Sequence, residues 1–253
     1  MSPNSSFKVI TRIYSDSEVN YKGNQATMAK LKYSGIKIPM IIHSYRTGGE
    51  SVKTGSLRSD SSFEVIMHFD YDSSLTIRNG DTVKTPTESL AGMKIASVYT
   101  KDNKLIGIQV LNGKLPDDLK QVLAKTIEDL YKKIKFPVKP MNIGDSFKQT
   151  IPVKIPLGSA PPIEMKMKVE YKLMKVEGYK AYFNTIYKMT LNDSLETLKI
   201  NLTGNGTGKL IHDLQKNFAI ENNSEMKMKE IITTKEIETI VTSTSKSYFK
   251  VLE

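Results

Sequence analysis

One amphipathic helix near the middle of the chain constrains the fold most, because the sequence on both sides of it has the patterns of strands. Between Leu115 and Pro140, apolar residues recur at spacings of three and four, which places them on one stripe of a helix. Pro116 suits the first turn, and Pro137 ends the pattern. We therefore predict a long helix at Pro116–Lys135, whose apolar stripe must be covered by strands. The stripe consists of Leu119, Val122, Leu123, Ile127, Leu130, Tyr131 and Ile134.

The clearest strand pattern lies at Ile163–Leu173, where apolar and charged residues alternate strictly. Such alternation is typical of an antiparallel sheet with one buried and one solvated face. The Asn79-Gly80 pair between two short apolar runs predicts a hairpin. Ala26–Tyr33 is ambiguous between helix and strand, and the Ser34-Gly35 pair that follows favours a strand here.

These patterns predict a mainly β, α+β fold. We expect a curved antiparallel sheet or half-open barrel, with the helix Pro116–Lys135 packed on its concave face. The chain is expected to form one β-rich domain at residues 7–253, after a disordered tail at residues 1–6. Its parts would be a β half at 7–112, a helix and proline-rich connector at 115–140, and a second β half at 142–253.

Two segments in the first half are expected to depart from regular interior strands. Pro39 demotes Ile36–Tyr45 to an edge strand or a bulge, because proline cannot donate to the sheet ladder. Thr47–Ser62 is polar and contains three glycines, which predicts a long loop. Loops of this length are usually functional or disordered, so this segment is a candidate contact surface.

Composition restricts the classes of function. With 39% hydrophobic and 25% charged residues the chain is globular rather than disordered. It contains no cysteine, which excludes disulfides, thiolate metal sites and a cysteine nucleophile. The net charge is +10, but only four of the 37 basic residues are arginine, and the lysines alternate with apolar residues along strands. We therefore predict a lysine-covered solvent face and no nucleic-acid partner.

No pattern indicates catalysis or metal binding. The three histidines, His43, His68 and His212, lack the spacing of metal ligands. Composition alone leaves a Ser-His-Asp triad open, but the Gly-x-Ser-x-Gly pattern is missing from the sequence. We therefore predict a protein that is not an enzyme, with no catalytic residue, no metal and no cofactor.

The segment Gly204–Lys209 resembles a phosphate-binding loop but lacks the required spacing. A P-loop needs a glycine where Thr203 stands and a serine or threonine where Leu210 stands. Three glycines at alternate positions instead leave one face of a strand without side chains, so the sheet can bend sharply there or a bulky group can lie against the backbone. The aromatic candidates for such a covering group are Tyr182, Phe183, Tyr187 and Phe218.

Methionines supply the only indication of a ligand. Twelve methionines and no tryptophan indicate a soft, adaptable inner face, which suits either an ordinary core or an apolar pocket. The first hypothesis is a non-catalytic domain that binds an apolar or lipid-like ligand between sheet and helix. The second is a protein-interaction module that uses the sheet as scaffold and the loop Thr47–Ser62 for contact. The candidate apolar lining consists of Met165, Met167, Val169, Tyr171, Leu173, Met226, Met228, Leu123 and Leu130.

Three stretches together carry a resemblance: Leu90–Met93, Phe136–Phe147 and Gly204–Gly208. The chain resembles a family of uncharacterised secreted bacterial proteins and lipoproteins, mostly from Gram-negative, Bacteroidetes-type organisms. The resemblance implies an exported domain, periplasmic or at the cell surface, whose signal peptide precedes this sequence. It also implies an envelope protein as partner and membrane attachment only through a lipid anchor, and it transfers no catalytic residue. Ser2–Ser6, polar and without an apolar core, fits a cytoplasmic protein as well as a mature exported one.

Overall fold

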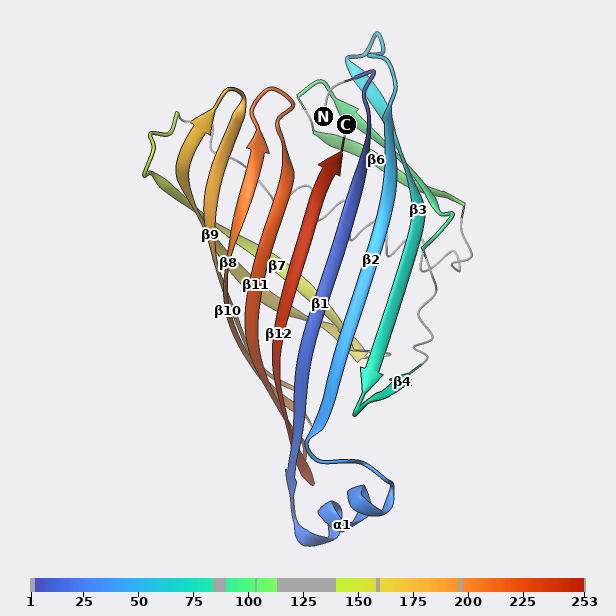
Figure 1. Cartoon of the computed structure of the whole chain (residues 1–253), viewed down its shortest axis with the longest axis vertical. Helices are drawn as coiled ribbons and strands as arrows, with labels where there is room; N and C mark the ends of the chain where they lie inside the picture. Colours follow the sequence, from blue (N-terminus) through green and yellow to red (C-terminus); the bar gives the residue numbers. More distant parts are fainter. Residues whose placement is uncertain are drawn as a thin grey trace.

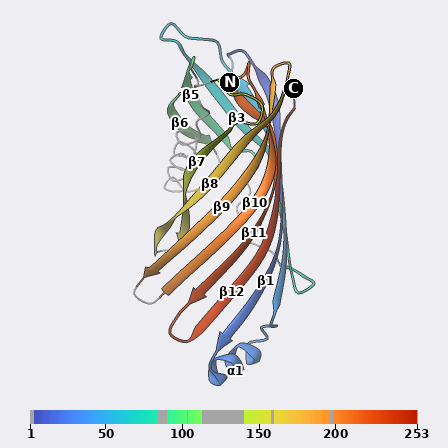
Figure 2. The same ribbon diagram turned by 90° about the vertical axis from the view of Figure 1, so that its left-hand side faces the viewer.

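The computed structural model describes residues 3–83, 90–102, 104–112, 140–157, 160–195 and 198–252. Within them the chain forms one antiparallel sheet of twelve strands and one short helix. The sheet is curved into an open trough, with its end strands brought round to the same side (Figures 1 and 2). The predicted mainly β fold with a curved antiparallel sheet is therefore confirmed. The predicted helix Pro116–Lys135, with Leu123 and Leu130, lies outside the described residues.

The strand order shows how the two halves of the chain are joined. Across the sheet it is β6-β5-β3-β2-β1-β12-β11-β10-β9-β8-β7, with β4 attached to β3. Each half is a meander of neighbours in sequence, and the pairing of β1 with β12 joins the two meanders. The first half contains β1 (Ser6–Gly23), α1 (Gln25–Tyr33), β2 (Met40–Thr54), β3 (Ser62–Arg78), β4 (Asp81–Val83), β5 (Lys94–Thr100) and β6 (Leu105–Asn112). The second contains β7 (Ser146–Leu157), β8 (Ala160–Glu177), β9 (Lys180–Leu195), β10 (Leu198–Asp213), β11 (Phe218–Thr233) and β12 (Ile237–Leu252).

Strand β2 corrects two predictions. It runs without interruption to Thr54 and lies between β1 and β3, so the predicted long loop at Thr47–Ser62 is wrong over its first half. The glycines are tolerated because Gly49 sits at a bulge under the ring of Tyr71, which occupies the place of a side chain. The edge-strand prediction is also wrong, since Pro39 precedes the first residue of β2 and removes no ladder hydrogen bond.

Helix α1 corrects the predicted strand at Ala26–Tyr33. The Asn24 side chain accepts a hydrogen bond from the Thr27 N–H at 2.9 Å and caps the first turn. Gly35, with a φ of +75°, ends the helix, and the Ile36 N–H donates to the Leu31 carbonyl at 3.1 Å. This is a Schellman motif. The Ser34-Gly35 pair is therefore a helix stop rather than a turn between strands.

The buried side chains form three clusters on one face of the sheet. The amino-terminal cluster consists of Val9, Val52, Phe63, Val65, Tyr99 and Leu105. The aromatic cluster consists of Ile151, Val169, Tyr171, Leu173, Ala181 and Phe183. The methionine cluster consists of Met165, Met189 and Leu202. Because side chains alternate along each strand, residues such as Lys166, Lys168 and Lys172 point to the other face and are exposed, which confirms the predicted alternation in β8.

Small residues occupy the middle of this face, between the clusters. Ser224 of β11 and Ser247 of β12 are hydrogen-bonded through their hydroxyls at 2.7 Å. The register places further serines of β12, β1 and β2 in the same rows, and glycines of β10 beside them. On the concave side of a bent sheet side chains converge, so small ones permit the curvature. The serines are Ser15, Ser17, Ser44, Ser224, Ser243, Ser245 and Ser247.

Gly204, Gly206 and Gly208 all lie within the continuous strand β10. A side-chain carbon at Gly206 would meet the Glu225 carbonyl oxygen and, at 2.7 Å, the Cγ atom of Met226. The predicted close approach is confirmed, but the neighbour is strand β11 and its methionine. Tyr187 of β9, one of the predicted aromatics, pairs with Gly206. None of its atoms is among the three nearest to a side-chain carbon at Gly206.

Candidate functional site

The structure brings the described candidate residues together on the inner face of the trough. Met226 and Met228 of β11 pack against the methionine cluster, and Met167 of β8 contacts both that cluster and the aromatic cluster. Val169, Tyr171 and Leu173 belong to the aromatic cluster, and Met165 to the methionine cluster. Leu123 and Leu130 lie outside the described residues.

Three of these methionines remain partly open to solvent. Met165 is 5% exposed, whereas Met167, Met226 and Met228 are only half-buried. Met228 lies over the backbone of β10, its Cγ atom 3.1 Å from the position of a side-chain carbon at Gly204. An unbranched methionine above glycine can change rotamer without displacing a branched neighbour. The inner face is therefore able to adapt to an apolar ligand.

Met189 and Leu202 complete this surface, but the sequence patterns did not identify them as candidate lining residues. Both lie on the inner face because β9 and β10 are registered with β8 and β11. The alternating apolar residues of Ala181–Leu191 carry the signal for Met189. Leu202 precedes the glycines, and only the strand register connects it to the methionines.

Two half-buried carboxyl groups lie on the same inner face. Glu230 pairs with Leu202 at the end of the methionine cluster, and burial raises the pKa of its carboxyl. Glu50 pairs with Val9 beside the amino-terminal cluster. Burial, followed by the charges of Asp70 and Asp72, raises the pKa of Glu50. Both groups disfavour an additional negative charge near them.

Arg46 and Asp72 form the strongest ion pair near this face. The guanidinium donates to both carboxylate oxygens, Nε to Oδ1 at 3.1 Å and one terminal nitrogen to Oδ2 at 3.2 Å. The Leu90 N–H also donates to Oδ2 at 3.1 Å. Burial opposes ionisation of Asp72, but Arg46 and the Leu90 N–H hold the pKa of its carboxyl below the ordinary value. This pair fixes β2 to β3 and ties down the chain before β5.

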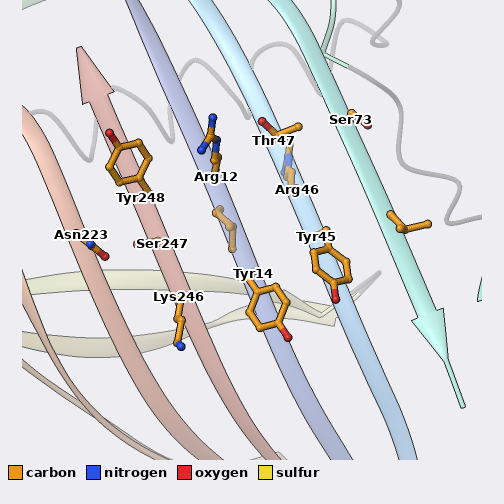
Figure 3. Close-up of a pocket in the computed structure, with 12 residues that line it drawn as sticks. Arg12, Tyr14, Tyr45, Arg46, Thr47, Ser73, Asn223, Lys246, Ser247 and Tyr248 are labelled. Carbon is orange, nitrogen blue, oxygen red and sulfur yellow. The ribbon is translucent and has the colours of Figure 1, made fainter. Parts of the chain in front are cut away.

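The opposite, outer face carries a hollow of about 460 Å³ over β11, β12, β1, β2 and β3. Figure 3 shows Tyr14, Tyr45 and Tyr248, with Arg12 and Lys246, on the side of the strands turned to the viewer. They occupy the positions that alternate with the inner serines and apolar residues. The side chains that line the hollow from this face are Arg12, Tyr14, Tyr45, Thr47, Ser73, Leu75, Asn223, Lys246 and Tyr248.

A row of polar side chains runs from the hollow along β1 and β2. Interaction of the Tyr14 hydroxyl with the Asp16 carboxylate, followed by that with Tyr45, raises the pKa of Tyr14 to about 12. The Asp16 carboxylate also accepts from Nδ1 of His43, which holds the pKa of Asp16 below the ordinary value. The Tyr14 ring itself packs edge to face against Tyr45.

A second group on the outer face contains serine, histidine and aspartate. The Asp70 carboxylate accepts from the Ser51 hydroxyl and from Nδ1 of His68, the latter at 2.9 Å. The aspartate therefore lies between the other two, whereas a catalytic triad requires the histidine between serine and aspartate. Among the described residues, no three or more histidine, aspartate or glutamate side chains are placed to hold a metal ion.

His212 is a buried titratable group of β10, next to the buried Asp213. It is 4% exposed, and burial lowers the pKa of its imidazole, although Asn217 and Asp213 act in the opposite direction. The folded protein therefore binds fewer protons than the unfolded chain once the pH falls below about 6.5. Stability from this group is present above that pH and is lost as the pH falls towards the lowered pKa.

Replacing His212 by glutamine, which does not titrate, is expected to reduce this loss. Urea denaturation at about pH 7 and about pH 5 gives the decrease in unfolding free energy for each protein. The decrease should be smaller for His212→Gln than for the parent. The raised pKa values of Glu50 and Glu230 have the opposite effect, increasing the unfolding free energy as the pH falls. Both groups are present in both proteins, so they do not affect the comparison. Equal decreases would show that His212 is not shielded from protonation in the folded state.

Comparisons with known proteins give no family. A scan against protein-family models returns no match, and a search of curated proteins returns none. Among solved structures, the crystal structure of Pseudomonas aeruginosa OccK5 (OpdH) aligns over 97% of this chain and 98% of that chain, with 7% sequence identity and a TM-score of 0.28. Similarity at this level identifies neither a fold family nor a function. In the described part of the chain, no helix combines the length and the apolar character required to cross a membrane.

Proposed function

We propose that the protein is a non-catalytic binding protein that holds an apolar or lipid-like ligand against the inner face of its trough. The observation that carries the proposal is the methionine cluster with Met167, Met226 and Met228, half-buried beside the glycine backbone of β10. Flexible, polarisable methionines are used in proteins to line surfaces that accept varied apolar partners. Neighbouring aromatic and aliphatic side chains extend this surface along β8 and β9.

The carboxyl groups on this face restrict the ligand. Glu50 and Glu230 both have a pKa raised by burial, so an anionic group placed beside either would raise the electrostatic cost further. The proposed ligand therefore has a neutral or cationic polar end, such as an acylglycerol or an aminolipid. A free fatty acid is the less suitable candidate.

An envelope location belongs to the same proposal and is supported by the resemblance to secreted bacterial proteins and lipoproteins. An exported carrier or receptor for apolar molecules would function there. The competing interaction-module hypothesis keeps only the second half of the loop on which it was based, because residues 47–54 belong to β2 and residues 55–61 connect β2 to β3.

The proposal is tested with the neutral fluorescent probe N-phenylnaphthylamine, together with native mass spectrometry and organic extraction of the purified protein. We expect the parent protein to bind the probe and Met228→Gln to weaken binding about tenfold, because an amide would be placed in an apolar contact. Lys229→Gln introduces the same residue one position further, on the opposite face, and should leave binding unchanged. Equal effects of both variants, or no binding and no extractable ligand, would contradict the proposal.

A further inference from the structure

The outer hollow is separate from the apolar inner face and has different chemistry. Its side chains come from alternate positions of the same strands, so the sheet itself lies between the two surfaces. Three tyrosines and three basic residues, of which Arg46 is paired with Asp72, line a volume of about 460 Å³. This volume falls within the range of small-molecule sites, roughly 300–1,000 Å³.

The tyrosines present fixed aromatic faces. Tyr14 and Tyr45 meet edge to face, with ring centroids 4.9 Å apart, and Tyr45 remains 40% exposed. This contact orients the two rings relative to each other. On the other side of the hollow the Arg12 guanidinium lies 6.0 Å from the centroid of the Tyr248 ring. Orienting these rings in advance reduces the entropy lost when a ligand stacks on them.

The charge of the hollow is positive where a ligand would enter. Within the described residues Arg12 has no carboxylate within 4 Å, so its planar guanidinium is available for two parallel hydrogen bonds. The Lys246 ammonium lies 3.8 Å from Glu225 and is largely exposed. The Asp16 carboxylate is already bonded to His43. The hollow therefore favours an anion over a cation.

Polar side chains at the rim supply weaker, uncharged contacts. Asn223, Thr47 and Ser73 line the hollow (Figure 3), and their amide and hydroxyl groups both donate and accept hydrogen bonds. Such groups match the hydroxyls of a sugar, while a tyrosine face matches the C–H surface of a sugar ring. A guanidinium matches a carboxylate or sulfate on the same ring.

We infer that this hollow is a binding site for an acidic saccharide. The carboxylate or sulfate of the sugar binds Arg12, with Lys246 adding charge. The ring lies against the exposed face of Tyr45, and Asn223 bonds to its hydroxyls. The site is independent of the proposed apolar ligand, because it uses the other face of the sheet.

Calorimetric titration of the full chain with digalacturonate tests the inference, with lactose as the neutral disaccharide and AMP as an anion with a planar base. We expect digalacturonate to bind at least about tenfold more tightly than lactose, a difference of about 1.4 kcal/mol. Arg12→Gln and Tyr45→Ala should each weaken binding by a similar factor, and Arg12→Lys less than Arg12→Gln. Arg58→Gln, at an exposed arginine outside the hollow, should have no effect.

The remaining outcomes overturn the inference. Absence of digalacturonate binding, equal binding of lactose, or tighter Arg12-dependent binding of AMP would each exclude a saccharide site. Thermal unfolding of each variant, compared with the parent, identifies any loss caused by misfolding, and Arg12→Lys serves where Arg12→Gln fails to fold. Binding of N-phenylnaphthylamine should be unchanged in Arg12→Gln, so failure of this inference and failure of the proposed function are distinguishable.

Discussion

Replacing Gly206 by valine is expected to destabilise the protein by on the order of 3 kcal/mol or more, one of the two largest effects that we predict. The new side chain would overlap the Glu225 carbonyl oxygen, and its first carbon would lie 3.0 Å from the Cα atom of Met226. Backbone atoms cannot rotate away as a flexible side chain can, so β10 and β11 would have to separate. Urea or thermal denaturation measures the loss.

Gly107→Val is the matched control for this change. Gly107 also lies in a strand, β6, but a side-chain carbon there meets no atom within 4 Å. Valine favours strands and restricts the unfolded chain, so this variant should be as stable as the parent or slightly more stable. Equal behaviour of the two variants would show that the glycines of β10 are only a flexible segment.

Truncating Phe63 to alanine is expected to cost about 3–5 kcal/mol, because the cavity left behind adds to the lost transfer free energy. Phe63 is 0% exposed in the amino-terminal cluster. Its ring is stacked near Tyr99, with centroids 6.1 Å apart. The free energy of unfolding from denaturant titration gives the cost.

Tyr33→Ala removes an aromatic ring of similar size from the end of α1, where the side chain is 94% exposed. Its effect should stay within about 0.5 kcal/mol. If Phe63→Ala were as mild, the amino-terminal cluster would not be a packed core. If Tyr33→Ala were as severe, α1 would be buried in solution against something outside the described structure.

Local patterns in the sequence predicted the elements that depend on near neighbours. Alternation placed Met165–Leu173 correctly on two faces, and Asn79-Gly80 correctly formed a hairpin turn, with φ values of +52° and +93°. Helix α1 was also locally encoded by Asn24 and Gly35, but the glycine was assigned to a turn. The length of β2 could not be predicted, because Gly48 and Gly49 resemble a loop until Tyr71 of β3 is seen lying against Gly49.

The two candidate sites differ in how far the sequence could predict them. The methionine surface follows from alternation within β8 and β11, so most of its residues were identified. The outer hollow assembles side chains from five strands, including Arg12, Tyr45 and Tyr248. Its residues become neighbours only through the register of β1 with β12 and β2, a long-range pairing for which one sequence carries no local signal.

The place of β12 between β1 and β11 determines when this sheet can be completed during synthesis. Of the twelve strands, β1 is synthesised first and β12 last, yet they pair from Lys8 opposite Leu252 to Gly23 opposite Ile237. Until then β1 and β11 both expose open backbone edges, which are templates for pairing with another chain. Contacts so distant in sequence also form slowly. Strand β12 therefore protects the newly made sheet from aggregation as well as joining its two halves, and a chaperone that covers these two edges would be most useful just before β12 is synthesised.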